Sequence, residues 1–295
     1  MRILEYDLKN MPPCPVILLI GRRRSGKTVT TMNLMRHYSQ KVKYAIAMVG
    51  SNSTVQEFSD VMPSTFIHEK VDFEILQRLI DRQNKVAKQR KPDNVLLVID
   101  DLAYGNFFKS EQIKQLVCNG RHLGITLIIT VQYLRVCPPI FRANCDLIFA
   151  AQEKSTMYRK ALYENFSICF SNFFDFSRTY RELTKNFSMM VLVTCSGEAS
   201  DRVEDNVFWI TSPYPTPKFK INPNGRWWTL HMRTQNPLGR SSEKEGIQKM
   251  TLSEHRTLMQ PRVQKHEPVE EKEKNFIMTV GNAPKIKTNR VSRFS

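Results

Sequence analysis

The sequence predicts an α/β fold with a mostly parallel sheet and helices on both faces. Three short, almost unbroken apolar runs, at residues 16–20, 95–99 and 125–131, are typical of parallel strands that are covered on both sides. Segments with helical spacing of apolar residues alternate with these runs along the chain. Each run is followed at once by glycine or by a polar residue, and ligands of open α/β sheets bind at that end of the strands.

The remaining elements follow from periodicity and from turn residues. After the first strand and a glycine loop, residues 29–35 begin a helix. We then expect a strand at 43–49, a short helix at 55–60, a short strand at 66–67, a helix from 72 that ends in the basic run 85–91, a helix at 110–119, and further strands at 147–150, 189–194 and 207–210. We predict one domain over 1–215, a basic aromatic extension over 216–236 and a flexible, basic, charged tail over 237–295.

Composition restricts the partners and the compartment. The 44 Lys+Arg against 28 Asp+Glu give a formal charge of +16, which favours a polyanionic partner, with nucleic acid ahead of an anionic membrane surface. No apolar stretch reaches the roughly 20 residues that cross a bilayer, and the N-terminus is too polar for a signal peptide. We therefore expect an intracellular protein with reduced cysteines.

A complete phosphate-binding loop follows the first strand. It lies between a buried strand and a helix, which is the context that this motif requires. Its glycines let successive backbone N–H groups converge on an anion at the positive end of the helix, and its lysine reaches the β- and γ-phosphates. The loop predicts a P-loop NTPase, and the residues expected to bind ATP are Gly21, Arg22, Arg23, Arg24, Ser25, Gly26, Lys27 and Thr28.

An acidic pair follows the strand at 95–99. Asp100 is expected to hold Mg²⁺ together with the Thr28 hydroxyl, and Asp101 is the candidate that orients or deprotonates the attacking water. Gln132, at the end of the next apolar strand, is placed to sense the γ-phosphate. Arg121 precedes that strand, at an edge of the subunit, where a guanidinium could enter the site of a neighbouring subunit.

These blocks resemble the three motifs of the FtsK/HerA superfamily of DNA-pumping ATPases, which have a RecA/ASCE-like P-loop fold. Residues 21–28, 96–101 and 120–132 carry the resemblance, and within the superfamily the chain is most similar to the poxvirus-type genome-packaging ATPases of large double-stranded DNA viruses. The resemblance implies that Arg121 acts in trans and that Gln132 is the sensor. One departure is that many members have Asp-Glu where this chain has Asp100 and Asp101.

The resemblance also implies partners and a location. We expect a homo-oligomeric ring that pumps double-stranded DNA without reading its sequence, a capsid or vertex protein as a further partner, and residence at the viral assembly site in the host cytoplasm and in the virion. Three alternatives stay open at this point: a P-loop nucleoside or nucleotide kinase, another pump of the superfamily such as a phage-extrusion ATPase, and a non-enzymatic protein that retains the fold.

Overall fold

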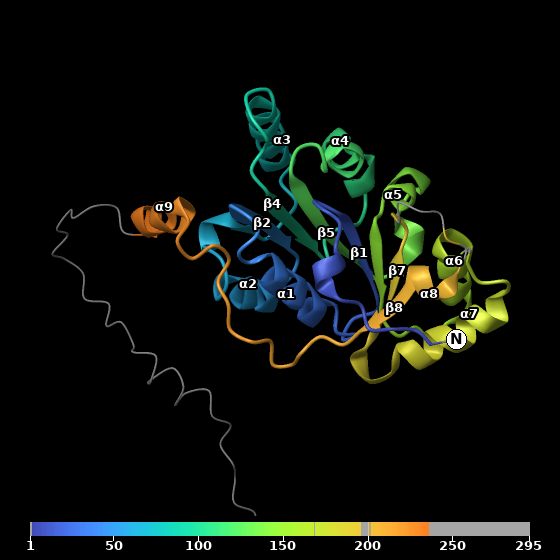
Figure 1. The fold of residues 1–295 in the computed structure, drawn as a ribbon. Coiled ribbons are helices and arrows are strands. Elements are labelled where there is room, and N and C mark those ends of the chain that lie inside the picture. The colour runs from blue at the N-terminus through green and yellow to red at the C-terminus, as the bar shows by residue number, and fades with distance from the viewer. Residues whose placement is uncertain (1, 168, 196–199, 201, 236–295) are drawn as a thin grey trace, which may run out of the picture. The chain divides into compact units, whose positions relative to one another are not determined.

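An eight-stranded sheet forms the centre of the molecule (Figure 1). The computed structural model describes residues 2–235 except 168, 196–199 and 201, so the tail predicted over 237–295 lies outside the described residues. The strands are β1 (Val16–Ile20), β2 (Tyr44–Val49), β3 (Ile67–His68), β4 (Val95–Asp100), β5 (Ile125–Val131), β6 (Leu147–Ala150), β7 (Met189–Val193) and β8 (Val207–Ile210). Their order across the sheet is β3-β2-β4-β5-β1-β6-β7-β8.

The sheet is parallel from β3 to β6, and β7 and β8 are antiparallel to their neighbours. The predicted mostly parallel α/β fold is therefore confirmed. Strand β5 lies between β1, which carries the phosphate loop, and β4, which carries the acidic pair.

Helices cover both faces of the sheet. The longer ones are α1 (Lys27–Tyr38), α2 (Asn52–Ser59), α3 (Phe73–Ala87), α4 (Glu111–Asn119), α6 (Thr156–Phe166), α7 (Phe173–Leu183) and α9 (Arg226–Gln235). Two shorter ones are α5 (Pro139–Ala143) and α8 (Val203–Asn206), and single 3₁₀ turns lie at Leu8–Asn10, Ser64–Phe66, Phe107–Lys109, Leu134–Val136 and Lys185–Phe187.

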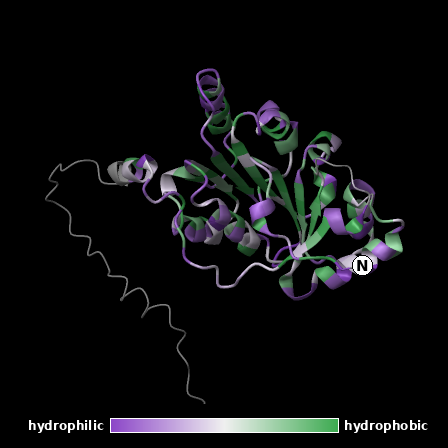
Figure 2. Cartoon of the chain, viewed as in Figure 1, coloured by the Kyte–Doolittle hydropathy of each residue, from purple (hydrophilic) through white to green (hydrophobic). Residues whose placement is uncertain are grey.

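The apolar residues of each strand divide between two cores, because successive side chains point to opposite faces of a sheet. In β1, Leu18 packs with the α3 and α4 side, whereas Ile17 and Leu19 pack with the α1 and α2 side. The hydropathy view shows the strands as an apolar layer between helices whose outer faces are polar (Figure 2). Double-sided burial explains why the central strands read as continuous apolar runs.

Side-chain caps set the starts of four α-helices among the described residues, and Asn172 is the cap of α7. Ser51, Asp72 and Ser110 accept hydrogen bonds from backbone N–H groups in the first turns of α2, α3 and α4. The helix expected at 110–119 is thus confirmed, with Ser110 as its cap. Helix α3 continues to Ala87 and takes in the first part of the basic run.

Residues of the predicted extension over 216–236 pack against the α1 and α2 side of the sheet. Ile221 and Trp227 are buried in that core, and the Trp228 indole N–H donates to the Ile221 carbonyl at 3.0 Å. The Lys220 ammonium lies over the Trp228 ring, 5.1 Å from its centroid. The aromatic residues of this segment therefore contribute to the hydrophobic core.

Candidate nucleotide-binding site

The phosphate loop joins the carboxyl end of β1 to the first turn of α1. Gly26 adopts φ +87°, a left-handed conformation that side-chain-bearing residues rarely take. Gly21 is held close to its surroundings, since a Cβ at this position would lie 2.7 Å from the Ala151 Cβ and would also collide with Ser25. Both glycines are therefore required by the shape of the loop.

The loop is built to receive an anion. Lys27 is only 7% exposed, and its Nζ donates to the carbonyl oxygens of Gly21 (2.7 Å) and Arg22 (3.1 Å). Burial lowers the pKa of this lysine, and the negative charges of Asp101 and Asp100 oppose that shift. The buried Ser25 hydroxyl has no hydrogen-bond partner among the residues that the structure describes. A phosphate group fits this combination of a buried cation, a free hydroxyl and a helix N-terminus.

The two acidic residues at the end of β4 have different environments. Asp100 is 4% exposed, and burial raises the pKa of its carboxyl group. Thr130 on β5 joins the pair: its hydroxyl donates to Asp100 Oδ1 at 2.8 Å and accepts from the Asp101 backbone N–H at 2.9 Å. Asp101 is exposed and has φ +58°. Asp100 is thus fixed inside the site, while Asp101 faces solvent.

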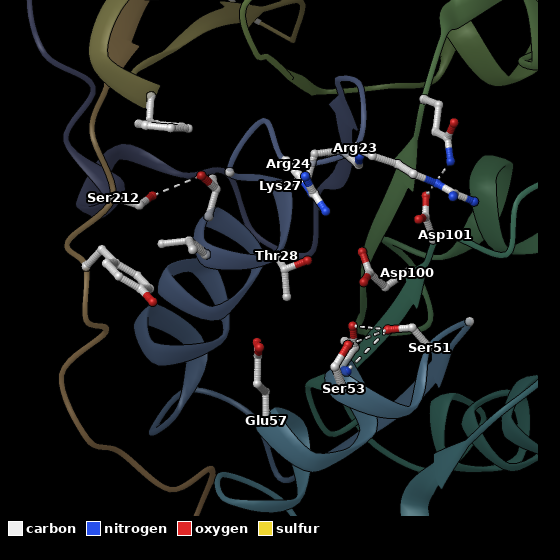
Figure 3. Close-up of a pocket in the computed structure, with 18 of the residues that line it drawn as sticks. Arg23, Arg24, Lys27, Thr28, Ser51, Ser53, Glu57, Asp100, Asp101 and Ser212 are labelled. Carbon is white, nitrogen blue, oxygen red and sulfur yellow. Dashed lines mark hydrogen bonds between the residues drawn. The ribbon is translucent and has the colours of Figure 1, made fainter. Parts of the chain in front are cut away.

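Eight of the predicted site residues line one cavity of about 1110 Å³: Arg23, Arg24, Gly26, Lys27, Thr28, Asp100, Asp101 and Gln132. Figure 3 shows the Thr28 side chain and the Asp100 carboxylate facing each other across it. Gln132 Nε2 lies 3.5 Å from Asp101 Oδ1, at the limit of a hydrogen bond. The hydroxyl and carboxylate oxygens of Thr28 and Asp100 are ligands that Mg²⁺ prefers, so these residues fit such an ion.

The three loop arginines separate into two groups. Arg22 points away from the cavity and forms a two-point ion pair with Glu153, with both nitrogen–oxygen distances at 3.0 Å. Its guanidinium also lies 6.0 Å from the centre of the Tyr158 ring. Arg23 and Arg24 line the cavity. Arg22 therefore fixes the loop to the segment after β6, and the other two arginines are available to a ligand.

Arg121 does not lie with the other predicted site residues. It stands in the turn before β5, at the amino end of the parallel strands, and is paired with the buried carboxylate of Asp146. Asp146 also accepts a hydrogen bond from the Val16 backbone N–H at 2.8 Å. The five residues of β1 span about 16 Å, so Arg121 cannot reach the cavity of its own subunit.

Several residues around the cavity were absent from the sequence prediction. Thr130 does not line the cavity itself but bonds two residues that do, and it has a detectable signal, since it is a polar residue inside an apolar strand, and hydroxyls in such positions need partners. Further lining residues come from α1 (Val29 and Thr30) and from segments with no recognisable motif: Gly50, Ser51, Ser53, Thr54, Glu57, Leu102, Tyr104, Asn186, Phe187, Thr211, Ser212 and Tyr214.

The fold and the loop define a P-loop NTPase of the class in which one strand separates the phosphate loop from the acidic strand. The profile of the family described as Poxvirus A32 protein matches residues 6–172, more than half of the chain. The chain belongs to this family and is a viral genome-packaging ATPase with a nucleotide-binding loop, as its three motif blocks predicted.

Similar proteins occur in other large viruses. An uncharacterized protein of Acanthamoeba polyphaga mimivirus is 27% identical over 70% of this chain and 76% of its own length. An uncharacterized protein of Invertebrate iridescent virus 3 is 28% identical over 72% of this chain and 86% of its own length.

Two solved structures illustrate the range of similar folds. The conjugation coupling protein TcpA of pCW3 is 17% identical, covers 77% of this chain and 74% of that chain, and has a TM-score of 0.52. The genome packaging NTPase of Sulfolobus turreted icosahedral virus 2 is 16% identical, covers 69% of this chain and all of that chain, and has a TM-score of 0.48.

In the described part of our chain, no helix has both the length and the apolarity to span a membrane.

Proposed function

We propose that this ATPase couples ATP hydrolysis to the movement of double-stranded DNA into a viral capsid. The observation that carries the proposal is the gathering of Lys27, Thr28, Asp100, Asp101 and Gln132 around one cavity in a chain of the Poxvirus A32 protein family. The first two residues come from the phosphate loop and the other three from the ends of β4 and β5. These are the positions at which an open α/β sheet binds its ligands.

The residues divide the chemistry between them. Lys27 and the backbone N–H groups of the loop hold the β- and γ-phosphates. Thr28 and Asp100 hold Mg²⁺, which neutralises charge on the phosphates when it is bound. Asp101 is exposed toward the cavity and orients or deprotonates the attacking water, and its 3.5 Å approach to Gln132 gives the glutamine a means of responding to the γ-phosphate.

Arg121 serves the site of a neighbouring subunit in a homo-oligomeric ring. It lies at the amino ends of the parallel strands, whereas its own cavity lies at their carboxyl ends. Its side chain is 53% exposed although it pairs with Asp146. An arginine supplied in trans stabilises the charge that develops during phosphoryl transfer and raises the rate by about 10³ to 10⁵.

DNA is held through its phosphates. The formal charge of +16 supplies attraction that does not depend on base sequence, and such binding weakens steeply as salt rises. A capsid or vertex protein receives the motor at the assembly site in the host cytoplasm, and the virion is a second location.

Steady-state ATP hydrolysis by the full-length protein, with and without long double-stranded DNA, tests the proposal. We expect DNA to stimulate turnover at low salt and to stimulate it less at moderate salt. Single-stranded DNA and heparin of matched phosphate or sulfate concentration serve as polyanion controls. Turnover that ignores DNA at both salt concentrations, or that requires a nucleoside acceptor, would contradict the coupling to DNA.

A further inference from the structure

The cavity extends beyond the phosphate site, to a region lined by two exposed aromatic side chains. Phe187 is 70% exposed and Tyr214 is 85% exposed, and both line the same cavity as Lys27. The phosphate end is marked by Asp100 and Asp101, and Figure 3 shows Ser212 on the other side of Thr28 from this pair. A nucleotide whose phosphates occupy the loop must therefore extend its base toward the segment that contains Ser212.

Antiparallel pairing brings the two aromatic segments together. Phe187 and Ser188 precede β7, Tyr214 follows β8, and the register pairs Met189 with Ile210. The amino end of β7 and the carboxyl end of β8 therefore lie next to each other. There the hydroxyls of Ser188 and Thr211 share a hydrogen bond of 2.6 Å. This is the edge that carries the phosphate loop, because β7 itself pairs with the carboxyl end of β6.

The backbone at Phe187 is strained in a way that presents its ring to the loop. Asn186 has φ +52° and Phe187 has φ +62°, and a left-handed conformation is unfavourable for a residue with a bulky side chain. The Cβ and Cδ1 atoms of Phe187 stand 3.9 Å from the point that a Cβ on Gly26 would occupy. Strain of this kind concentrates at ligand sites. A largely exposed ring contributes too little buried apolar area to offset the strain in the folded protein.

Most polar side chains near the two aromatic residues already form hydrogen bonds within the protein. Ser212 donates its hydroxyl to Thr30 at 3.1 Å, and Ser188 and Thr211 bond each other. The Asn186 side chain also lines the cavity, but an amide offers both a donor and an acceptor and can meet either purine edge. These groups provide no fixed pattern that distinguishes one base from another.

We infer that Phe187 and Tyr214 form an aromatic platform that holds the nucleobase by its face, so that the site accepts purine nucleoside triphosphates, GTP as well as ATP. The inference rests on the proposed nucleotide site and names its substrate class. Every base has a π-face, so binding by stacking tolerates changes at the base edge. Purines offer the larger face and should bind better than pyrimidines.

Equilibrium binding to the full-length protein tests the platform, with ATP, GTP, CTP and the base-free ligand tripolyphosphate as probes. We expect ATP and GTP affinities within about fivefold of each other. Phe187→Ala should weaken both by about 5- to 150-fold, the range for loss of one base–aromatic stack, and should leave tripolyphosphate unchanged. Phe187→Trp should restore purine binding, and Tyr214→Ala should resemble Phe187→Ala.

Phe174→Ala is the matched control, because Phe174 is 72% exposed on α7 and does not line the cavity. An ATP preference above about 50-fold over GTP, or unchanged ATP affinity in the Phe187→Ala, Tyr214→Ala double variant, would overturn the inference and leave the proposed function intact. Equal losses for ATP and tripolyphosphate would also overturn it, because they would indicate a distorted loop. Absence of binding by the unaltered protein to any of the probes would instead refute the nucleotide site itself.

Discussion

At the scale of single residues, Lys27 combines a functional position with an unfavourable one for folding. Its ammonium is buried against two backbone carbonyls, and burial lowers its pKa. Lys27→Ala should reduce ATP turnover at least about 100-fold, since it removes a preorganised charge from the reacting phosphates. The thermal midpoint should not fall, because the variant also removes a buried cation.

Turnover and thermal unfolding of Lys27→Ala are compared with those of Lys70→Ala, which changes an exposed lysine outside the cavity. Retained turnover in the first variant would remove Lys27 from the site.

Thr130 is a second residue whose role is specific, because one hydroxyl bonds both acidic residues. Thr130→Val keeps the shape of the side chain and leaves the Asp100 carboxylate and the Asp101 N–H without this partner. We expect turnover to fall by about 10- to 100-fold, in line with about 1.5–3 kcal/mol for a buried hydrogen bond to a charged group. Thr130→Ser keeps the hydroxyl and should retain most of the turnover; undiminished turnover in Thr130→Val would show that the hydroxyl is dispensable.

At the scale of elements, the side-chain amide of Gln83 forms hydrogen bonds with the loops that precede two central strands. Gln83 on α3 is fully buried, and its Nε2 donates to the carbonyl oxygens of Asp93 (2.8 Å) and Leu123 (2.6 Å), which precede β4 and β5. Gln83→Ala should lower the free energy of unfolding by about 1–3 kcal/mol, because it leaves one buried and one half-buried carbonyl without this partner.

Urea unfolding measures this difference, with the exposed Gln89→Ala as the control for the same substitution. A stability loss of the same size in Gln89→Ala would mean that the effect does not come from the buried amide.

The strands and the phosphate end of the site could be predicted because their signals are local. A strand that is buried on both faces needs a continuous apolar run. Polar residues that follow such runs lie together at the carboxyl ends of the parallel strands. The proposed base end could not be predicted, because Phe187 and Tyr214 come to line one cavity only through the antiparallel pairing of β7 with β8. The ion pair of the Arg22 side chain could not be predicted for a similar reason: its partner Glu153 lies 131 positions away.

At the scale of the whole molecule, the proposed role of Arg121 requires that the activity of one subunit depend on another. Arg121 lies at the amino ends of the parallel strands, far from the cavity of its own subunit. When Arg121→Ala is the only chain present, turnover should therefore fall by about 10³-fold or more. A mixture with Lys27→Ala should regain activity, since an Arg121→Ala subunit keeps an intact phosphate loop and its Lys27→Ala neighbour supplies the missing guanidinium. Neither variant alone should be active.

Folding must be separated from catalysis in this experiment, because Arg121→Ala also leaves the buried Asp146 carboxylate without its partner. Arg121→Lys preserves a charge beside Asp146 but lacks the planar fork that stabilises a transferring phosphoryl group, so it should match the original thermal midpoint and remain inactive alone. Rescue of Arg121→Lys by Lys27→Ala, at total protein concentrations that permit subunit exchange, would identify the arginine as acting between subunits. If Arg121→Lys keeps full turnover by itself, or if no mixture recovers any, the residue acts only within its own subunit, as the partner of Asp146.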